Sequence, residues 1–311
     1  MGRVVLRKAG VAQYYIQSNQ GVIPMLVMFS SDYFDTKQID PAYAAEYEAV
    51  CKIPEFKTIL FNHDAFVEDG TVKIYPKDYY TGDCILRSWM LTPEQYAKLY
   101  SHLSDVGIRL INSPKQYNAC HLLPNALPYL ERHTPHSLIY PHGAPIDWNV
   151  VNKTFRKFMV KDYVKSVKET DFPAFFETPV EADEMNTHIA KFTEHRGKLY
   201  TGGIVLRDFV DFKRYGETTN EYRAFCLCGR LLSVSRNSNQ SESCPFVPSR
   251  FANSFTGFPS NYYTVDFAEA ADGTWIVLET GDGQVSGLSP NQFVFKYYDD
   301  MREIVRDHIT L

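Results

Sequence analysis

A pair of lysines stands at the end of an apolar segment, in the sequence FMVKDYVKS over residues 158–166. Lys161 and Lys165 would leave a buried strand, and two ammonium groups are costly to bury unless an anion meets them. Phosphate oxygens suit lysine, which donates to them as a point charge. A solvated strand end is the competing interpretation. The chain has neither GxxxxGK[ST] nor GxGxxG, so a bound nucleotide would need another architecture.

Three of the carboxylates near the end of the chain, within YYTVDFAEAADGTWIVLETGDG, are candidate metal ligands. Asp266 and Glu279 flank an Asp-Gly turn, which favours a hairpin, so the two would come close if the strands pair. Asp282 follows on a glycine-rich loop. Carboxylates that converge need a cation, and their oxygens suit Mg²⁺ that bridges nucleotide phosphates. An acidic surface hairpin is the alternative.

Two further segments carry arginines, GGIVLRDFVDF and NEYRAFCLCG. The first places Arg207 and Asp208 at a polar break after an apolar strand. The second places Glu221 and Arg223 two residues apart, on one face of a strand. Arg223 could form an ion pair, which contributes little stability when exposed. Its functional interpretation is a clamp for a phosphate or an acyl phosphate.

The pattern of elements predicts α/β plus α+β architecture. Over residues 20–145, apolar runs alternate with helical patterns, which is typical of an α/β layer with a mostly parallel sheet. Beyond five prolines between 121 and 148, the chain reads as antiparallel strands flanked by helices. We expect strands over 157–164, 203–210, 221–227, 231–234, 262–268 and 274–279, and helices over 180–195 and 291–308. The predicted domains are 1–145 and 146–311.

Composition limits the classes of protein that remain. The chain of 311 residues has 44% hydrophobic and 22% charged residues, which is typical of globular domains. Its net charge of −5 gives no overall field for a phosphate backbone, so nucleic acid is a weak expectation as partner. No apolar run reaches the roughly 20 residues of a membrane span. Six cysteines without CxxC spacing indicate reduced thiols and a cytoplasmic protein.

The order of these parts resembles the ATP-grasp fold: a lysine strand, a hinge after a Gly-Gly turn, an arginine strand, an aspartate strand, and a glutamate with an acidic loop. More narrowly, the chain is similar to the ATP-grasp clade named for an arginine and two lysines. The segments LRSWMLTPEQY, VKDYVKS and DGTWIVLETGDGQVSGL carry this likeness. It extends from SSDYFD near residue 30 to the last helix, and it implies an amino-terminal pre-ATP-grasp α/β domain.

The resemblance implies a nucleotide-binding role for two segments. Lys161 and Lys165 look like the lysines that hold ATP phosphates, and Lys165 is also a candidate catalytic residue. Arg207, Asp208, Phe209 and Val210 are similar to the hinge whose backbone meets adenine.

The resemblance also implies catalytic and metal-binding residues. Arg223 looks like the strand arginine that faces the phosphates or the reacting intermediate, and Asp266 and Glu279 resemble the paired Mg²⁺ ligands. One departure is that a glycine stands at position 281, where the family has asparagine; Asp282 is the candidate substitute ligand. Arg87 is a candidate to reach the cleft, with a structural role beside Trp89 as the alternative.

An ATP-dependent ligase is the implied function, with ATP and Mg²⁺ as cofactors. Such enzymes activate a carboxylate as an acyl phosphate, which an amine, a thiol or another nucleophile then attacks. The substrate would be a small molecule or a peptide. Two alternatives stay open at this stage: ligation or modification of a nucleic-acid or nucleotide end, and a nonenzymatic nucleotide-binding module.

Overall fold

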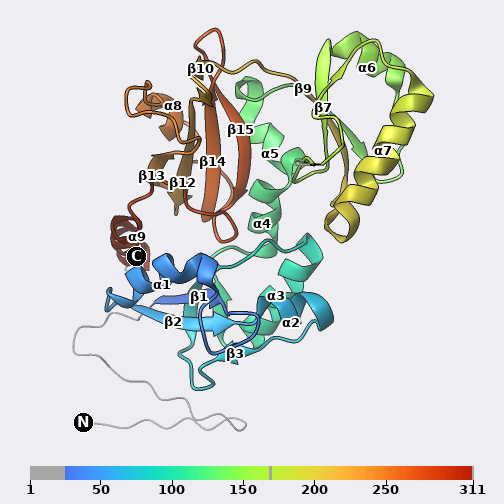
Figure 1. The fold of residues 1–311 in the computed structure, drawn as a ribbon. Coiled ribbons are helices and arrows are strands. Elements are labelled where there is room, and N and C mark those ends of the chain that lie inside the picture. Colours follow the sequence, from blue (N-terminus) through green and yellow to red (C-terminus); the bar gives the residue numbers. More distant parts are fainter. Residues whose placement is uncertain (1–24, 168–169, 310–311) are drawn as a thin grey trace, which may run out of the picture.

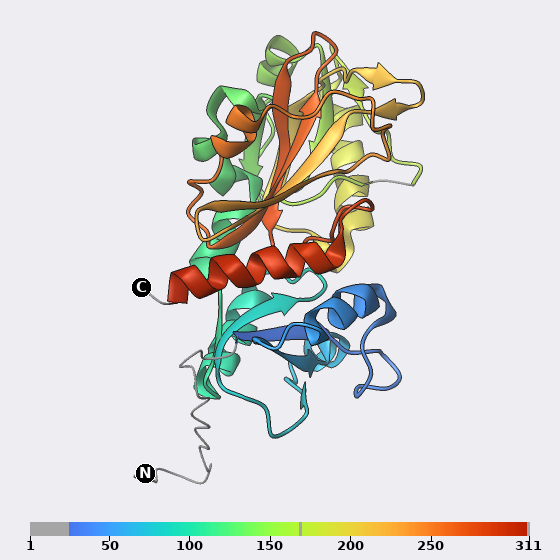
Figure 2. The same ribbon diagram turned by 90° about the vertical axis from the view of Figure 1, so that its left-hand side faces the viewer.

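The computed structural model describes residues 25–167 and 170–309, which form two halves joined side by side (Figures 1 and 2). The first half contains a sheet in the order β3-β2-β1-β4-β5, whose members are parallel except for β3. Its strands are β1 (Met25–Ser30), β2 (Phe56–Phe61), β3 (Ile74–Tyr75), β4 (Gly82–Arg87) and β5 (Ile108–Leu110). Its helices are η1 (Pro41–Tyr43), α1 (Ala44–Cys51), α2 (His63–Asp69) and α3 (Pro93–Asp105).

Burial explains why the first sheet forms where it does. Every residue of β1 is buried, as a strand covered on both faces requires. Alternate side chains enter two separate cores, Val27 and Phe29 on one face and Leu26 and Met28 on the other. The predicted parallel α/β layer is therefore confirmed.

The second half contains two four-stranded sheets. One has the order β6-β9-β7-β8 and the other β13-β12-β14-β15, both antiparallel throughout. The strands are β6 (Ser137–Pro141), β7 (Lys157–Lys161), β8 (Phe176–Glu177), β9 (Gly203–Asp208), β12 (Glu221–Leu227), β13 (Arg230–Arg236), β14 (Tyr262–Glu269) and β15 (Trp275–Asp282), with a small ribbon of β10 (Arg214–Tyr215) and β11 (Thr218–Thr219). The helices are α4 (Pro114–His121), α5 (Leu123–Leu130), η2 (Glu131–His133), α6 (Trp148–Thr154), α7 (Ala182–Arg196), η3 (Gly197–Leu199), α8 (Ser249–Asn253) and α9 (Val294–Ile309).

Several elements before residue 145, the predicted domain boundary, pack with the second half. Strand β6 pairs with β9 of the second half. Helices α4 and α5 pack on the larger antiparallel sheet, where Cys120, Ala126 and Leu130 share a core with Val265 and Val277. The prolines that suggested a connection therefore lie within the second structural half.

Helix α9 joins the two halves. Tyr297, Tyr298 and Met301 on this helix share one buried cluster with Phe29 and Val50 of the first half. Figure 2 shows α9, in red, lying across the junction. The last element of the chain thus fixes how the first sheet meets the second half.

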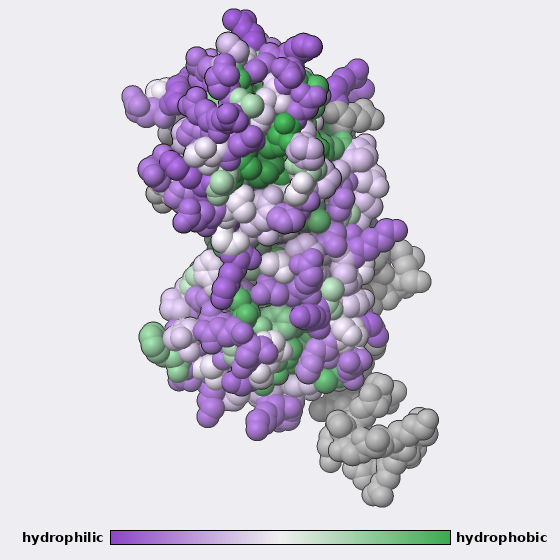
Figure 3. Space-filling view, turned by 90° about the vertical axis from the view of Figure 1, so that its right-hand side faces the viewer, coloured by the Kyte–Doolittle hydropathy of each residue, from purple (hydrophilic) through white to green (hydrophobic). Residues whose placement is uncertain are grey.

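Most of the surface seen in Figure 3 is hydrophilic, and its apolar residues gather in limited areas. Among residues 25–167 and 170–309, no helix combines the length and apolarity that a bilayer crossing needs. All six cysteines are free thiols.

Candidate active site

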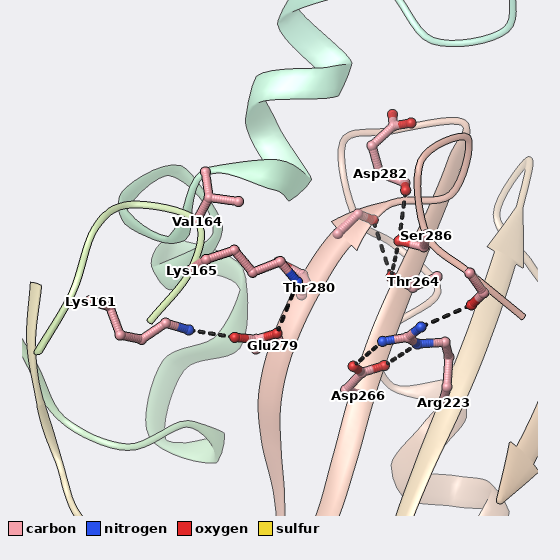
Figure 4. A network of polar contacts seen from close by, with 12 residues as sticks. Lys161, Val164, Lys165, Arg223, Thr264, Asp266, Glu279, Thr280, Asp282 and Ser286 are labelled. Carbon is pink, nitrogen blue, oxygen red and sulfur yellow. Dashed lines mark hydrogen bonds and ion pairs between the residues drawn. The ribbon is translucent and has the colours of Figure 1, made fainter. Parts of the chain in front are cut away.

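Strand pairing aligns three predicted site residues across the larger antiparallel sheet. Asp266 on β14 lies opposite Arg223 on β12 and opposite Glu279 on β15. Arg223 donates from Nε and Nη2 to the two oxygens of Asp266 at 2.8 and 2.7 Å, a two-point contact that fixes both planar groups. The three side chains share one face of the sheet in Figure 4.

The predicted lysines meet these carboxylates from the smaller sheet. Lys161, at the end of β7, donates from Nζ to Glu279 Oε1, and Lys165 Nζ lies 4.0 Å from Glu279 Oε2. Lys161 is only 3% exposed, whereas the Lys165 side chain is half exposed. Positive and acidic groups that are more than 110 residues apart in sequence therefore face one site (Figure 4).

Arg207 adds a third cation to this site through its side chain. It is 4% exposed and donates from Nη2 to Thr134 Oγ1 at 2.6 Å. Within the described part of the chain, its Nε has no hydrogen-bond partner. Burial lowers the pKa of Arg207 to about 10, against the attraction of Glu279. The resemblance implied a role only for the backbone of Arg207, so the place of its side chain is a finding of the structure.

The charges in the cleft do not balance locally. Burial by itself would raise the pKa of Glu279, but Lys161, Lys165 and Arg207 together hold that pKa well below its usual range. Burial also lowers the pKa of Lys161, although its partner Glu279 opposes the shift. Three cations thus act on one carboxylate, so the site has an excess of positive charge that a further anion would pair with.

One residue that sequence reasoning missed sets the turn between the lysines. Asp162 is fully buried, and its Oδ1 accepts from the backbone amides of Val164 and Lys165, both at 2.7 Å. Its Oδ2 accepts from Arg196 Nε at 2.8 Å. An aspartate followed two and three residues later by its own hydrogen-bonded amides is a common turn, so the letters KDYVK held this signal.

The family decides how this site is understood. Residues 146–306 match the family model described as an ATP-grasp domain, family 3 of the clade named for an arginine and two lysines. The chain belongs to this family. No curated protein matches the chain at a significant level.

Solved ATP-grasp structures share the fold over most of the chain. The D-cycloserine synthetase DcsG is 15% identical, with a TM-score of 0.59 over 90% of this chain and 99% of that one. The D-alanyl-alanine synthetase A of Vibrio cholerae is 10% identical, with a TM-score of 0.60 over 93% and 99%. The D-alanine–D-alanine ligase of Bacillus anthracis, complexed with ATP, is 12% identical, with a TM-score of 0.58 over 92% and 99%. The predicted ATP-grasp fold is confirmed.

Two predicted site residues of this ATP-grasp chain lie elsewhere. Asp282 is three residues from Glu279 on the same strand, so alternation directs it to the opposite face. It is fully buried and accepts from Asn112 Nδ2 and the Gln284 amide. The structure therefore does not bring Asp282 to the carboxylate pair, and we correct its assignment as a metal ligand.

Arg87 likewise does not open onto the cleft. It has no exposed surface and donates to both carboxylate oxygens of Glu46 and to the carbonyls of Gly283 and Ser286. All of its nitrogens are engaged and, unlike Arg223, its side chain has no exposed surface, so no donor is accessible to a substrate. The predicted catalytic role is therefore replaced by the structural alternative, although Trp89 bonds to Asp40 instead.

The hinge prediction is only partly compatible with the structure. Strand β9 ends at Asp208, and the amides of Asp208 and Phe209 donate to the carbonyls of His136 and Lys157 within the sheet. These two amides do not face a ligand. The Phe209 ring lies 4.5 Å from Lys157 Nζ and contacts Phe175, whose ring is 4.7 Å away. Val210 lies two residues past the end of the strand.

The carboxylate pair fits a divalent ion by its chemistry. Asp266 and Glu279 are opposed across two strands and offer hard oxygen ligands. Among the described residues, no group of three or more His, Cys, Asp or Glu side chains is arranged to hold a metal ion. Mg²⁺ commonly binds through one or two carboxylates together with substrate phosphates and water, so two protein ligands are compatible with a metal that arrives with a nucleotide.

Proposed function

We propose that this protein is an ATP-dependent ligase that joins a carboxylate to an amine, or to a thiol, through an acyl phosphate. Its membership of the ATP-grasp family supports an ATP-using enzyme. The single observation that carries the proposal is the excess of positive charge at Glu279, where Lys161, Lys165 and Arg207 act on one carboxylate. A triphosphate is a common biological anion, and it carries enough negative charges to pair with all three of these cations.

Different residues of the site would contact the phosphates, the adenine and the metal ion. Lys161 and Lys165 would contact the phosphates, and the free Nε of Arg207 would donate to a phosphate oxygen. Half-buried Phe209, with Val210, would lie beside the adenine. Asp266 and Glu279 would hold Mg²⁺, which neutralises phosphate charge as the γ-phosphoryl group is transferred.

The mechanism requires two successive displacements. A substrate carboxylate oxygen attacks the γ-phosphorus of ATP, and the bond to the β-phosphate oxygen breaks to release ADP. The amine then attacks the acyl carbon, inorganic phosphate leaves, and the amine loses a proton. Lys165 and Arg223 would stabilise the negative charge that develops in both steps. Donors that the protein already holds in place need not reorient when this charge develops.

The ion pairs of the structure explain how the site stays stable without a ligand. Arg223 covers Asp266 and Lys161 covers Glu279. In the presence of a magnesium nucleotide, Lys161 and Arg223 would pair with phosphate oxygens, and Asp266 and Glu279 would hold the metal. Binding then exchanges partners and leaves no charge alone.

An incubation with ATP, Mg²⁺ and a pool of carboxylates, amines and thiols tests the proposal. We expect ADP, phosphate and a product whose mass equals the acid plus the nucleophile minus water. AMP with pyrophosphate would contradict the acyl-phosphate route. Transfer to a nucleic-acid or nucleotide end would favour the first alternative that the sequence left open. Nucleotide binding without turnover would favour the second, a nonenzymatic binding module.

Matched lysine variants show whether the proposed site is responsible. Lys161→Met should abolish product formation, because the buried cation beside Glu279 is lost. Lys52→Met is the control, since Lys52 lies at the end of α1 in the first half and pairs with Glu48 at 2.8 Å. Equal activity of the two variants would show that Lys161 is not part of the active site.

We also propose that the protein acts in the cytoplasm, because its six cysteines are free thiols, as a reducing compartment favours.

A further inference from the structure

The end of strand β4 holds a loop that belongs to the other half of the molecule. Residues 283–287 follow β15, and three consecutive β4-end residues bond to them. Leu86 N donates to Gln284 Oε1 at 3.3 Å, Ser88 N donates to Gln284 O at 3.2 Å, and Arg87 Nη1 donates to the carbonyls of Gly283 and Ser286. This loop is therefore fixed from the amino-terminal half.

The same loop contacts the proposed active site one residue later. The carbonyl of Gly287 accepts from Arg223 Nη1 at 2.8 Å, while the other two donating nitrogens of Arg223 hold Asp266. On its other side, Ser286 Oγ lies 3.1 Å from Thr264 Oγ1, and Thr264 is two residues from Asp266 on β14 (Figure 4). The loop thus touches both strands that carry this ion pair.

Arg87 is the strongest link in this arrangement. It is fully buried, and Glu46 on α1 engages Nε and Nη2 of its guanidinium, so Nη1 can point only at the two carbonyls. Tyr298 of α9 donates in turn to Glu46. A side chain held on both sides fixes its partners more precisely than the same contacts on a mobile side chain would.

We propose that Arg87 is a positioning residue for the active site: it fixes loop 283–287, and through the Gly287 carbonyl it orients Arg223 against Asp266. The proposal deepens the function stated above and rests on it only for its catalytic consequence. Arg87 itself touches no substrate. Its effect on the site must therefore pass through Arg223.

Hydrogen exchange of the full-length protein tests the loop contact without any ligand. Arg87→Lys keeps the charge beside Glu46 but cannot make four directed bonds. Amides of 283–288 should exchange about 10-fold faster, since a lost bond to a carbonyl is worth on the order of 1 kcal/mol. Tyr298→Phe is the matched control, because it loosens Glu46 and leaves the carbonyl contacts in place. Unchanged exchange in Arg87→Lys, or equal acceleration in both variants, would overturn the proposal.

A double-mutant cycle tests the route to the metal ligands. The readout is Mn²⁺ affinity in the presence of a nonhydrolysable ATP analogue, followed by electron paramagnetic resonance. Arg87→Lys should weaken Mn²⁺ binding about 10-fold in the natural background and have little effect when Arg223 is already Lys, because coupled residues are not additive. Equal losses in both backgrounds would overturn the route through Arg223.

Two safeguards separate the possible failures. If Arg87→Lys does not fold, Gln284→Met loosens the same loop while leaving the Arg87 ion pair intact, and the same pattern is expected. If the natural protein binds no nucleotide with Mn²⁺, the proposed function fails, and hydrogen exchange alone then decides whether Arg87 holds the loop.

Discussion

Two arginine–carboxylate pairs in this molecule have the same chemistry and different roles. Arg87 and Glu46 are enclosed, with side-chain exposures of 0% and 10%, and every nitrogen of Arg87 has a partner within the protein. Arg223 and Asp266 keep side-chain exposures of 20% and 13% and lie on the face that meets the lysines. The enclosed pair lies in the first half and, through Arg87 Nη1, holds the carbonyls of Gly283 and Ser286 from the second half. The open pair has an exposed side from which new partners can approach.

The difference shows what makes an ion pair structural. An enclosed pair costs desolvation and recovers it only through complete hydrogen bonding, so losing one partner is severe. A pair with one open side can accept a metal or a phosphate without dismantling its surroundings. Accessibility of the last donor or acceptor, rather than residue type, separates the two cases.

Asp266→Asn gives the largest expected effect and addresses the open pair. The variant should lower ATP turnover by about 1,000-fold, since it removes a proposed metal ligand and the anion that orients Arg223. The contact of Asp266 with Arg223 predicts a small decrease in the melting temperature as well. Turnover of ATP and a thermal scan measure the two quantities, and undiminished turnover would exclude Asp266 from the metal site.

Glu46→Gln addresses the enclosed pair, and its main effect should be on stability. The change leaves the buried guanidinium of Arg87 without its anion, which costs roughly 3 kcal/mol in comparable pairs. Urea unfolding should show a lower free energy of unfolding, while turnover in the cold falls far less than for Asp266→Asn. If activity falls in parallel with Asp266→Asn and stability does not change, the contrast between the two pairs is wrong.

The sequence predicted both members of the open pair as site residues, but neither their contact nor the enclosed pair, for a physical reason. Strand periodicity and a hairpin turn were enough to place Asp266 beside Glu279, and charge near a strand end marked Lys161. The partner of Arg87 is 41 residues away on a helix, and nothing local indicates it. Asp282 is a different case, because alternation from Glu279 could have shown that it faces away.

Arg207→Met extends the comparison to an arginine that is buried and incompletely paired. ATP affinity should fall about 10-fold to 30-fold, because a charge-assisted bond to phosphate is lost. The melting temperature without ATP should rise, since methionine removes an uncompensated buried charge. Titration calorimetry and thermal scans measure both effects.

Arg196→Met is the matched control for that prediction. Arg196 is paired with the buried carboxylate of Asp162 at 2.8 Å, so the same substitution should lower the melting temperature. A rise for Arg196→Met, or a fall for Arg207→Met, would show that pairing does not distinguish these two arginines.

Asp282→Asn gives the smallest expected effect and returns to the enclosed interface. Burial raises the pKa of Asp282 to about 7, although Asn112 and Gln284 donate to it; in the unfolded chain the value is about 4. Between those two pH values the folded protein holds a proton that the unfolded chain has lost. The free energy of unfolding therefore decreases as pH rises through this window and is lowest above about pH 7.

Urea unfolding at pH 5 and pH 8 measures this contribution. The natural protein should lose stability between the two, and Asp282→Asn should reduce that loss by on the order of 2 kcal/mol. Asp307→Asn is the control, because Asp307 forms an exposed ion pair with Arg230 and should leave the difference unchanged. Parallel pH curves for the natural protein and Asp282→Asn would mean that Asp282 is ionised in the fold. It would then belong with the charged pairs of the molecule, as an anion held by Asn112 and the Gln284 amide.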